Sequence, residues 1–107
     1  MTKKFEGRWP FLYDSMSPTL SLKRIFSEDQ PILYVCHDYD GGYQFLDGGD
    51  VSEEDAAVVA LEEVFRLDPT IAEVACLPPG WRAYRDRVED LWQLLLPPDD
   101  EQNDQED

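Results

Sequence analysis

The sequence predicts a single α+β domain: a small antiparallel sheet of three to four strands, including a hairpin over residues 32–46, with two helices packed on one face. Two runs rich in β-branched and aromatic residues, 32–36 and 43–46, predict the strands of the hairpin. The Asp and Gly residues between these runs tolerate the backbone angles of a turn. An amphipathic helical pattern begins at Ser52. A chain of 107 residues, 42% of them hydrophobic, suits one domain with its own core.

Composition divides the chain into three parts. Trp9, Phe11 and Tyr13 lie in a first segment without regular periodicity, and we expect this arm to pack on the domain because exposed aromatics would form an adhesive patch. The last nine residues hold six acids and no base and follow Pro97 and Pro98, which predicts a solvated tail. The three parts are an irregular N-terminal arm at 1–19, the single α+β domain at 20–98 and a disordered acidic tail at 99–107.

Two helices are predicted after the hairpin. Ser52 precedes three acids, which is typical of a helix N-terminus. Apolar residues then recur at spacings of three and four, which predicts a helix over 52–67 that packs on the sheet. Asp68 followed by Pro69 predicts the start of a shorter helix over 69–75. The apolar stripe of the longer helix consists of Ala57, Val58, Leu61, Val64 and Phe65.

Two further segments have weaker patterns. Leu20 and Leu22 alternate with polar residues and predict a strand, which can extend to Phe26. For residues 81–95 the pattern favours a strand to about Arg85 and a short helical segment near Leu91, and one helix through both remains the alternative.

Charge is the strongest compositional signal. Asp and Glu number 24 against 9 Lys and Arg, so the net charge is −15 and the isoelectric point is near 4.1. Residues 28–81 contain thirteen acids and a single base, Arg66. Such a surface disfavours direct binding to nucleic acid, which requires clustered Lys and Arg. No apolar run reaches the length of a membrane span or follows the pattern of a secretory signal, so we expect a cytoplasmic protein without a membrane association.

The acids and one group of aromatic and basic residues form the predicted partner-binding set. Acidic turns and helix faces attract a basic protein, whereas Trp and Arg residues frequently anchor interfaces. The same residues are also explained by solubility and by core packing. The sequence predicts no cofactor, no catalytic residue and no metal ligand. The predicted binding residues are Asp38, Asp40, Asp47, Asp50, Glu62, Glu63, Trp81, Arg82 and Arg85.

Cys36 and His37 suggest an enzyme as an alternative. Adjacent strand residues point to opposite faces, however, so the pair cannot converge as a nucleophile and its base. Cys36 and Cys76 lack metal-ligand spacing and are expected to be free thiols, although a helix packed over the hairpin would allow a disulfide. Asp38 and Asp40 resemble the start of a calcium loop, but Gly49 stands where such a loop needs its final Glu.

Two segments carry a resemblance. Residues 31–48, with the HDxDGxxQFL-like hairpin, and residues 77–85, with the GWxAxR-like corner, are similar to a group of small acidic bacterial proteins of unassigned function. Some small proteins of this style act as immunity proteins beside toxins. The resemblance covers about residues 20–86 and implies no catalytic or binding residue.

These observations favour a non-catalytic cytoplasmic binding protein. Its partner would be a basic protein such as a toxin, which the acidic surface attracts before an aromatic patch is buried. One alternative is a DNA mimic that inhibits a nucleic-acid-binding protein by displaying regularly spaced carboxylates. The other alternative is the enzyme centred on His37 and Cys36.

Overall fold

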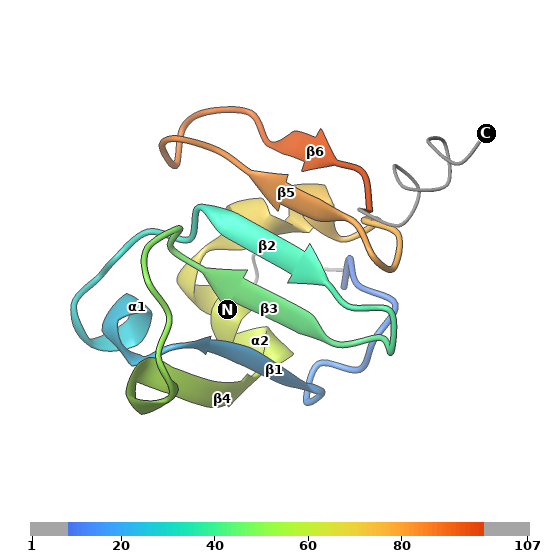
Figure 1. The fold of residues 1–107 in the computed structure, drawn as a ribbon. Coiled ribbons are helices and arrows are strands. Elements are labelled where there is room, and N and C mark those ends of the chain that lie inside the picture. The colour runs from blue at the N-terminus through green and yellow to red at the C-terminus, as the bar shows by residue number, and fades with distance from the viewer. Residues whose placement is uncertain (1–8, 98–107) are drawn as a thin grey trace.

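A computed structural model describes residues 9–97 of the chain, and its centre is a six-stranded mixed sheet with the strand order β4-β1-β3-β2-β5-β6 (Figure 1). The pairs are antiparallel except β1 with β3, which run parallel. The strands are β1 Pro18–Leu22, β2 Tyr34–His37, β3 Tyr43–Leu46, β4 Ala56–Ala60, β5 Arg82–Tyr84 and β6 Gln93–Leu95. The helices are α1 Lys23–Ser27 and α2 Leu61–Leu67, with 3-10 helices η1 Glu53–Asp55 and η2 Pro69–Val74.

The core lies on one side of this sheet. Figure 1 shows α2 and the segment after it behind the sheet. Val35, Phe45 and Ala83 are direct cross-strand neighbours and are completely buried. They face the apolar sides of α2 and η2. The buried side chains there are Leu61 and Val64 of α2 and Ile71 and Val74 of η2. Burial of these groups is the main source of stability.

The hairpin and the packing of the aromatic arm are confirmed. β2 and β3 pair antiparallel from Tyr34 opposite Leu46 to His37 opposite Tyr43. Phe11 is buried, and the Trp9 ring meets Phe65 edge to face with centroids 5.5 Å apart. The arm therefore completes the core. Pro18 and Thr19, which the sequence assigns to the arm, belong to β1. The acidic tail at 99–107 lies outside the described residues.

The predicted sheet of three to four antiparallel strands covered by two helices is wrong. The sheet is larger and mixed, and the two α-helices within residues 9–97 have only five and seven residues. Residues 23–27 form α1 instead of prolonging the first strand. Residues 93–95 pair with β5, where a short helical segment near Leu91 was predicted. The strand predicted from residue 81 to about Arg85 is confirmed as β5, Arg82–Tyr84.

The predicted helix over 52–67 is wrong in its first half. Residues 56–60 form β4, which pairs with the whole of β1 from Pro18 opposite Ala60 to Leu22 opposite Ala56. The sequence Ala-Ala-Val-Val-Ala is compatible with the apolar face of a helix and with a β-strand. Its pairing with β1 stabilises the strand. Ser52 donates to the Asp55 side chain at 3.1 Å and does not cap a helix.

The predicted helix start at Asp68 and Pro69 is confirmed. Asp68 Oδ1 accepts from the Thr70 amide at 3.0 Å, as an N-cap does. The segment that follows is a 3-10 helix, Pro69–Val74.

Candidate binding surface

A row of directly paired residues crosses all six strands on the face opposite the core. Directly paired residues carry their side chains on the same face of a sheet. None of the side chains in this row is fully buried, and Val58 at its β4 end is 72% exposed. The row consists of Val58, Leu20, Gln44, Cys36, Arg82 and Leu95. We call these residues, together with the paired Tyr34 and Tyr84, the open face.

The open face is apolar at its ends and polar at its centre. Gln44 Nε2 donates to both carboxylate oxygens of Asp38, at 3.1 and 3.2 Å. Arg82 Nη2 donates to the Leu96 carbonyl at 2.9 Å. The Nε of Arg82 is buried and has no acceptor among the described residues, which costs free energy. The centre of the open face is therefore polar.

A hollow of about 180 Å³ adjoins Cys36 and Arg82 of the open face. It brings together three of the predicted binding residues, Asp38, Trp81 and Arg82. The other residues lining it are Cys36, His37, Tyr39 and Gly80. Its rear wall is held to β2 by two backbone hydrogen bonds: the His37 amide donates to the Trp81 carbonyl at 3.0 Å, and the Gly80 amide donates to the His37 carbonyl at 2.6 Å.

Gly80 is required in this wall for two reasons. Its φ angle of +89° is one that other residues rarely adopt. A Cβ at this position would also lie 2.5 Å from Cζ of Tyr39. The Pro-Pro-Gly corner in the sequence is thus the local signal for the shape of the hollow.

His37 is held by structural contacts. Its Nδ1 lies 2.6 Å from the Leu77 carbonyl, which can only accept, so Nδ1 carries a proton and donates. Nε2 lies 2.9 Å from the Tyr13 hydroxyl, and the ring stacks on Tyr43 with centroids 4.3 Å apart. Both ring nitrogens are therefore engaged in fixing the arm and the corner to the sheet.

Cys36 lies on the opposite face from His37, as strand alternation predicts. Burial raises the pKa of the Cys36 thiol, which keeps it protonated at neutral pH. A protonated thiol facing away from the imidazole does not form a nucleophile and base pair. Cys36 and Cys76 are free thiols, as the sequence predicts.

Asp47 and Asp50 lie near Arg24 of α1. Arg24 Nε and Nη2 donate to the two Asp47 oxygens at 2.6 and 2.9 Å, and Nη2 also donates to the Asp50 carbonyl at 2.7 Å. The hydrogen bond from Arg24 lowers the pKa of Asp47 below its usual value. Asp55 is 3.3 Å from Nη1 of the same guanidinium. Arg24 thus ties the loop over 47–55 to α1, and Asp47 is a structural residue.

The predicted acids do not form one surface. Asp38 and Asp40 lie at the hairpin turn beside the open face, whereas Glu62 and Glu63 belong to α2 in the layer behind the sheet. Glu62 is 3.8 Å from Arg66. Asp38, Asp40, Asp50 and Glu63 form no ion pair with another described residue, since the described ion pairs involve Asp47, Asp55, Glu62, Asp68, Glu89 and Asp90.

Arg85 points into the protein and is only 3% exposed. Its guanidinium also lies 4.0 Å from the centroid of the Trp92 ring. Every N–H of the guanidinium is used within the chain, so none is available to a partner. The acceptors are Ile32 O for Nε and Nη2, Asp68 Oδ2 for Nη2, and Thr70 Oγ1 and Val88 O for Nη1.

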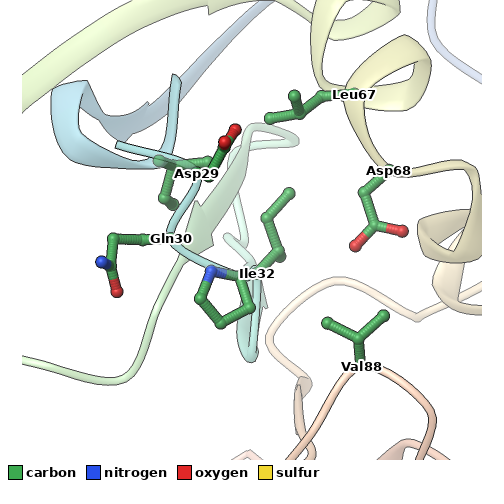
Figure 2. Close-up of a pocket in the computed structure, with 8 residues that line it drawn as sticks. Asp29, Gln30, Ile32, Leu67, Asp68 and Val88 are labelled. Atoms are coloured by element: carbon green, nitrogen blue, oxygen red, sulfur yellow. The ribbon is translucent and has the colours of Figure 1, made fainter. Parts of the chain in front are cut away.

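A second cleft, of about 330 Å³, lies away from the open face (Figure 2). Ile32 occupies its centre, with Leu67, Asp68 and Val88 on one side and Asp29 and Gln30 on the other. The Asp68 carboxylate is already engaged by Thr70 and Arg85. The cleft has apolar lining residues and the exposed Asp29 carboxylate, and these groups do not specify a ligand or a reaction.

The sequence patterns did not identify Val58, Tyr34 and Tyr84 as surface residues of one face. Side chains alternate between the two faces of a strand, so these residues can be assigned to one face only once β4 and β5 are known to be strands.

Over residues 9–97, no three His, Cys, Asp or Glu side chains are grouped so as to hold a metal ion. No helix in the same part of the chain has the length and apolar composition needed to cross a membrane.

Comparisons of the chain with protein-family models, with curated proteins and with solved structures found no match.

Proposed function

We propose that this chain is a non-catalytic binding protein of the bacterial cytoplasm that neutralises a basic protein partner, such as a toxin, through the open face. The observation that carries the proposal is the asymmetry of the sheet. Val35, Phe45 and Ala83 fill the covered side completely, whereas Val58 and Tyr84 on the other side are 72% and 38% exposed. A partner protein that covered this side of the sheet would bury these apolar side chains.

Charge supports a basic partner. The chain carries a net charge of −15, and Asp38 and Asp40 beside the open face form no ion pair with another described residue. Their field therefore acts on the surroundings and accelerates the encounter with a positively charged surface. Burial of Tyr84, Tyr34 and Val58 then provides affinity.

The compartment and the partner class rest on two further considerations. Free thiols at Cys36 and Cys76 favour a reducing compartment, which supports the cytoplasm. The similarity of residues 31–48 and 77–85 to small acidic proteins of immunity-protein style favours a toxin as the partner.

The proposal is tested by using the full chain as bait in an extract of the cells that produce it. Tyr84→Ala alters the open face, and Leu67→Ala is the matched control because Leu67 is similarly exposed, at 42%, but lies on α2. We expect the wild type and Leu67→Ala to retain the same basic protein, identified by mass spectrometry. Tyr84→Ala should weaken its binding about tenfold, the equivalent of ~1.4 kcal/mol.

Capture of no basic protein, or equal binding by both variants, would overturn the proposal. Thermal melts must show that Tyr84→Ala is folded, so that lost binding reports on the surface. Duplex DNA is then added as a competitor, and displacement of the captured protein would favour the DNA-mimic alternative instead of toxin neutralisation.

A further inference from the structure

β4 is an edge strand without the usual protection against strand pairing. Its only sheet neighbour is β1, and in Figure 1 the other side of β4 faces away from the sheet. Natural edge strands generally carry Lys, Pro, a bulge or an inward charge that prevents another strand from adding. β4 has the sequence Ala-Ala-Val-Val-Ala, and its five residues pair with β1 in unbroken register. It therefore has none of these features.

Val58 directs its main-chain groups to this unprotected edge. The carbonyl of Val59 accepts from Thr19 Oγ1 at 2.9 Å and so points towards β1. Carbonyl directions alternate along a strand, so the N–H and C=O of Val58 point away from β1. No other described segment lies hydrogen-bonded along this side of β4. Val58 thus presents one donor and one acceptor in the arrangement that an added strand requires.

We propose that β4 receives an extended segment of the basic partner by strand addition at Val58. This inference rests on the proposed function and deepens it by specifying how the partner binds. Main-chain hydrogen bonds provide affinity in such complexes, and alternate side chains provide specificity. The side chain of Val58 stands on the open face, so the added strand would enlarge that face.

The acidic residues at both ends of β4 indicate which charges the added segment carries. Glu53 and Glu54 precede the strand and Glu63 follows it, and none of them forms an ion pair with another described residue. A complementary segment has an apolar β-branched centre with Lys or Arg at both ends. The same acids on two chains would repel each other, so a second copy is disfavoured as the occupant.

The test uses a synthetic peptide, Lys-Arg-Val-Thr-Val-Thr-Val-Arg-Lys, titrated into isotopically labelled full-length protein. We expect NMR shifts centred on the Val58 amide and slower hydrogen exchange of that amide. One control peptide is N-methylated at each of its five central residues, which preserves its charge but blocks strand pairing along both edges of the peptide. A second control replaces the basic residues by Glu. Both controls should bind at least about tenfold more weakly, or ~1.4 kcal/mol.

A pair of protein variants tests the same edge. Val58→Pro removes the outward N–H, which an edge strand tolerates, and should abolish peptide binding. Val58→Thr keeps the N–H and the β-branched shape and should bind as the wild type does. Thermal melts verify that both variants are folded.

Equal binding of the N-methylated peptide, no binding of the first peptide, or unchanged binding by Val58→Pro would overturn strand addition at β4. Self-association of the wild type that Val58→Pro abolishes would also overturn it, because the occupant would then be a second copy. If the captured basic protein binds Val58→Pro and the wild type equally but still depends on Tyr84, the proposed function stands and only the edge inference fails.

Discussion

Arg85 and Asp68 form a buried ion pair in which Nη2 lies 2.8 Å from Oδ2, with the two side chains 1% and 14% exposed. Arg85 also contacts the carbonyls of Ile32 and Val88, and Asp68 caps η2 through Thr70. One pair thus connects the segment before β2, the turn after β5 and the start of η2. The pair explains why a residue predicted to bind a partner lies inside the domain.

Asp68→Ala should destabilise the protein strongly because it leaves the Arg85 charge buried without its counter-ion. Removal of one partner of a buried ion pair costs about 3–5 kcal/mol. Arg85→Lys should also be destabilising, since one ammonium group cannot replace the planar set of guanidinium donors. Urea unfolding measures both effects. A loss below about 1 kcal/mol for Asp68→Ala, the range of exposed pairs, would contradict this role.

The Arg24–Asp47 pair predicts a specific pH dependence of stability. The lowered pKa of Asp47 means that the folded state favours the ionised carboxylate. This contribution is fully present above the unfolded pKa of about 3.9 and is lost as pH falls through the lower folded pKa. Asp47→Asn should therefore be less stable than the wild type at pH 7, and the difference should shrink towards pH 2. Melting temperatures across this range test it, and equal stability at pH 7 would refute it.

Gly80→Ala should destabilise the corner that closes the hollow. The new Cβ would meet the Tyr39 ring, and Ala at a positive φ adds roughly 1 kcal/mol of backbone cost. In a Tyr39→Ala background the steric part disappears and only the backbone part remains. Denaturant melts of the double-mutant cycle should thus give a smaller cost for Gly80→Ala when Tyr39 is absent. The same cost in both backgrounds would show that the ring does not approach Gly80.

Asp38→Asn combined with Asp40→Asn should slow association with the captured basic protein. Long-range charge acts mainly on the encounter, so the association rate should fall several-fold while dissociation changes little. The effect should diminish at high salt, since the Debye length is already ~8 Å at 0.15 M. Glu62→Gln on α2 is the control, because that carboxylate lies behind the sheet near Arg66. Stopped-flow rates that are equal for all three proteins at low salt would exclude steering by this turn.

Local signals explain which parts of the fold were predictable. The hairpin and the Asp68 cap depend on neighbouring residues, and both are confirmed. β4 was not predictable because Ala-Ala-Val-Val-Ala fits a helix or a strand, and only its pairing with β1 decides. The short β6 likewise depends on β5.

The candidate site was predictable only in part, for the same reason. The sequence proposed Asp38, Trp81 and Arg82, and the fold brings these three together at one hollow. It also proposed Asp47 and Arg85, whose structural partners Arg24 and Asp68 are distant in sequence. A pattern along the chain shows charge but not which charges neutralise each other in space.

Side-chain footprinting with hydroxyl radicals tests the role of the open face most directly. The full chain is oxidised alone and in complex with the purified basic protein from the bait experiment. We predict that the partner protects Tyr84 and Val58, whereas Leu67 on α2 and Val88 at the second cleft keep the reactivity of the free protein. Protection of Leu67 and Val88 with unchanged reactivity at Tyr84 and Val58 would contradict the account, because the partner would then bind on the opposite side of the sheet.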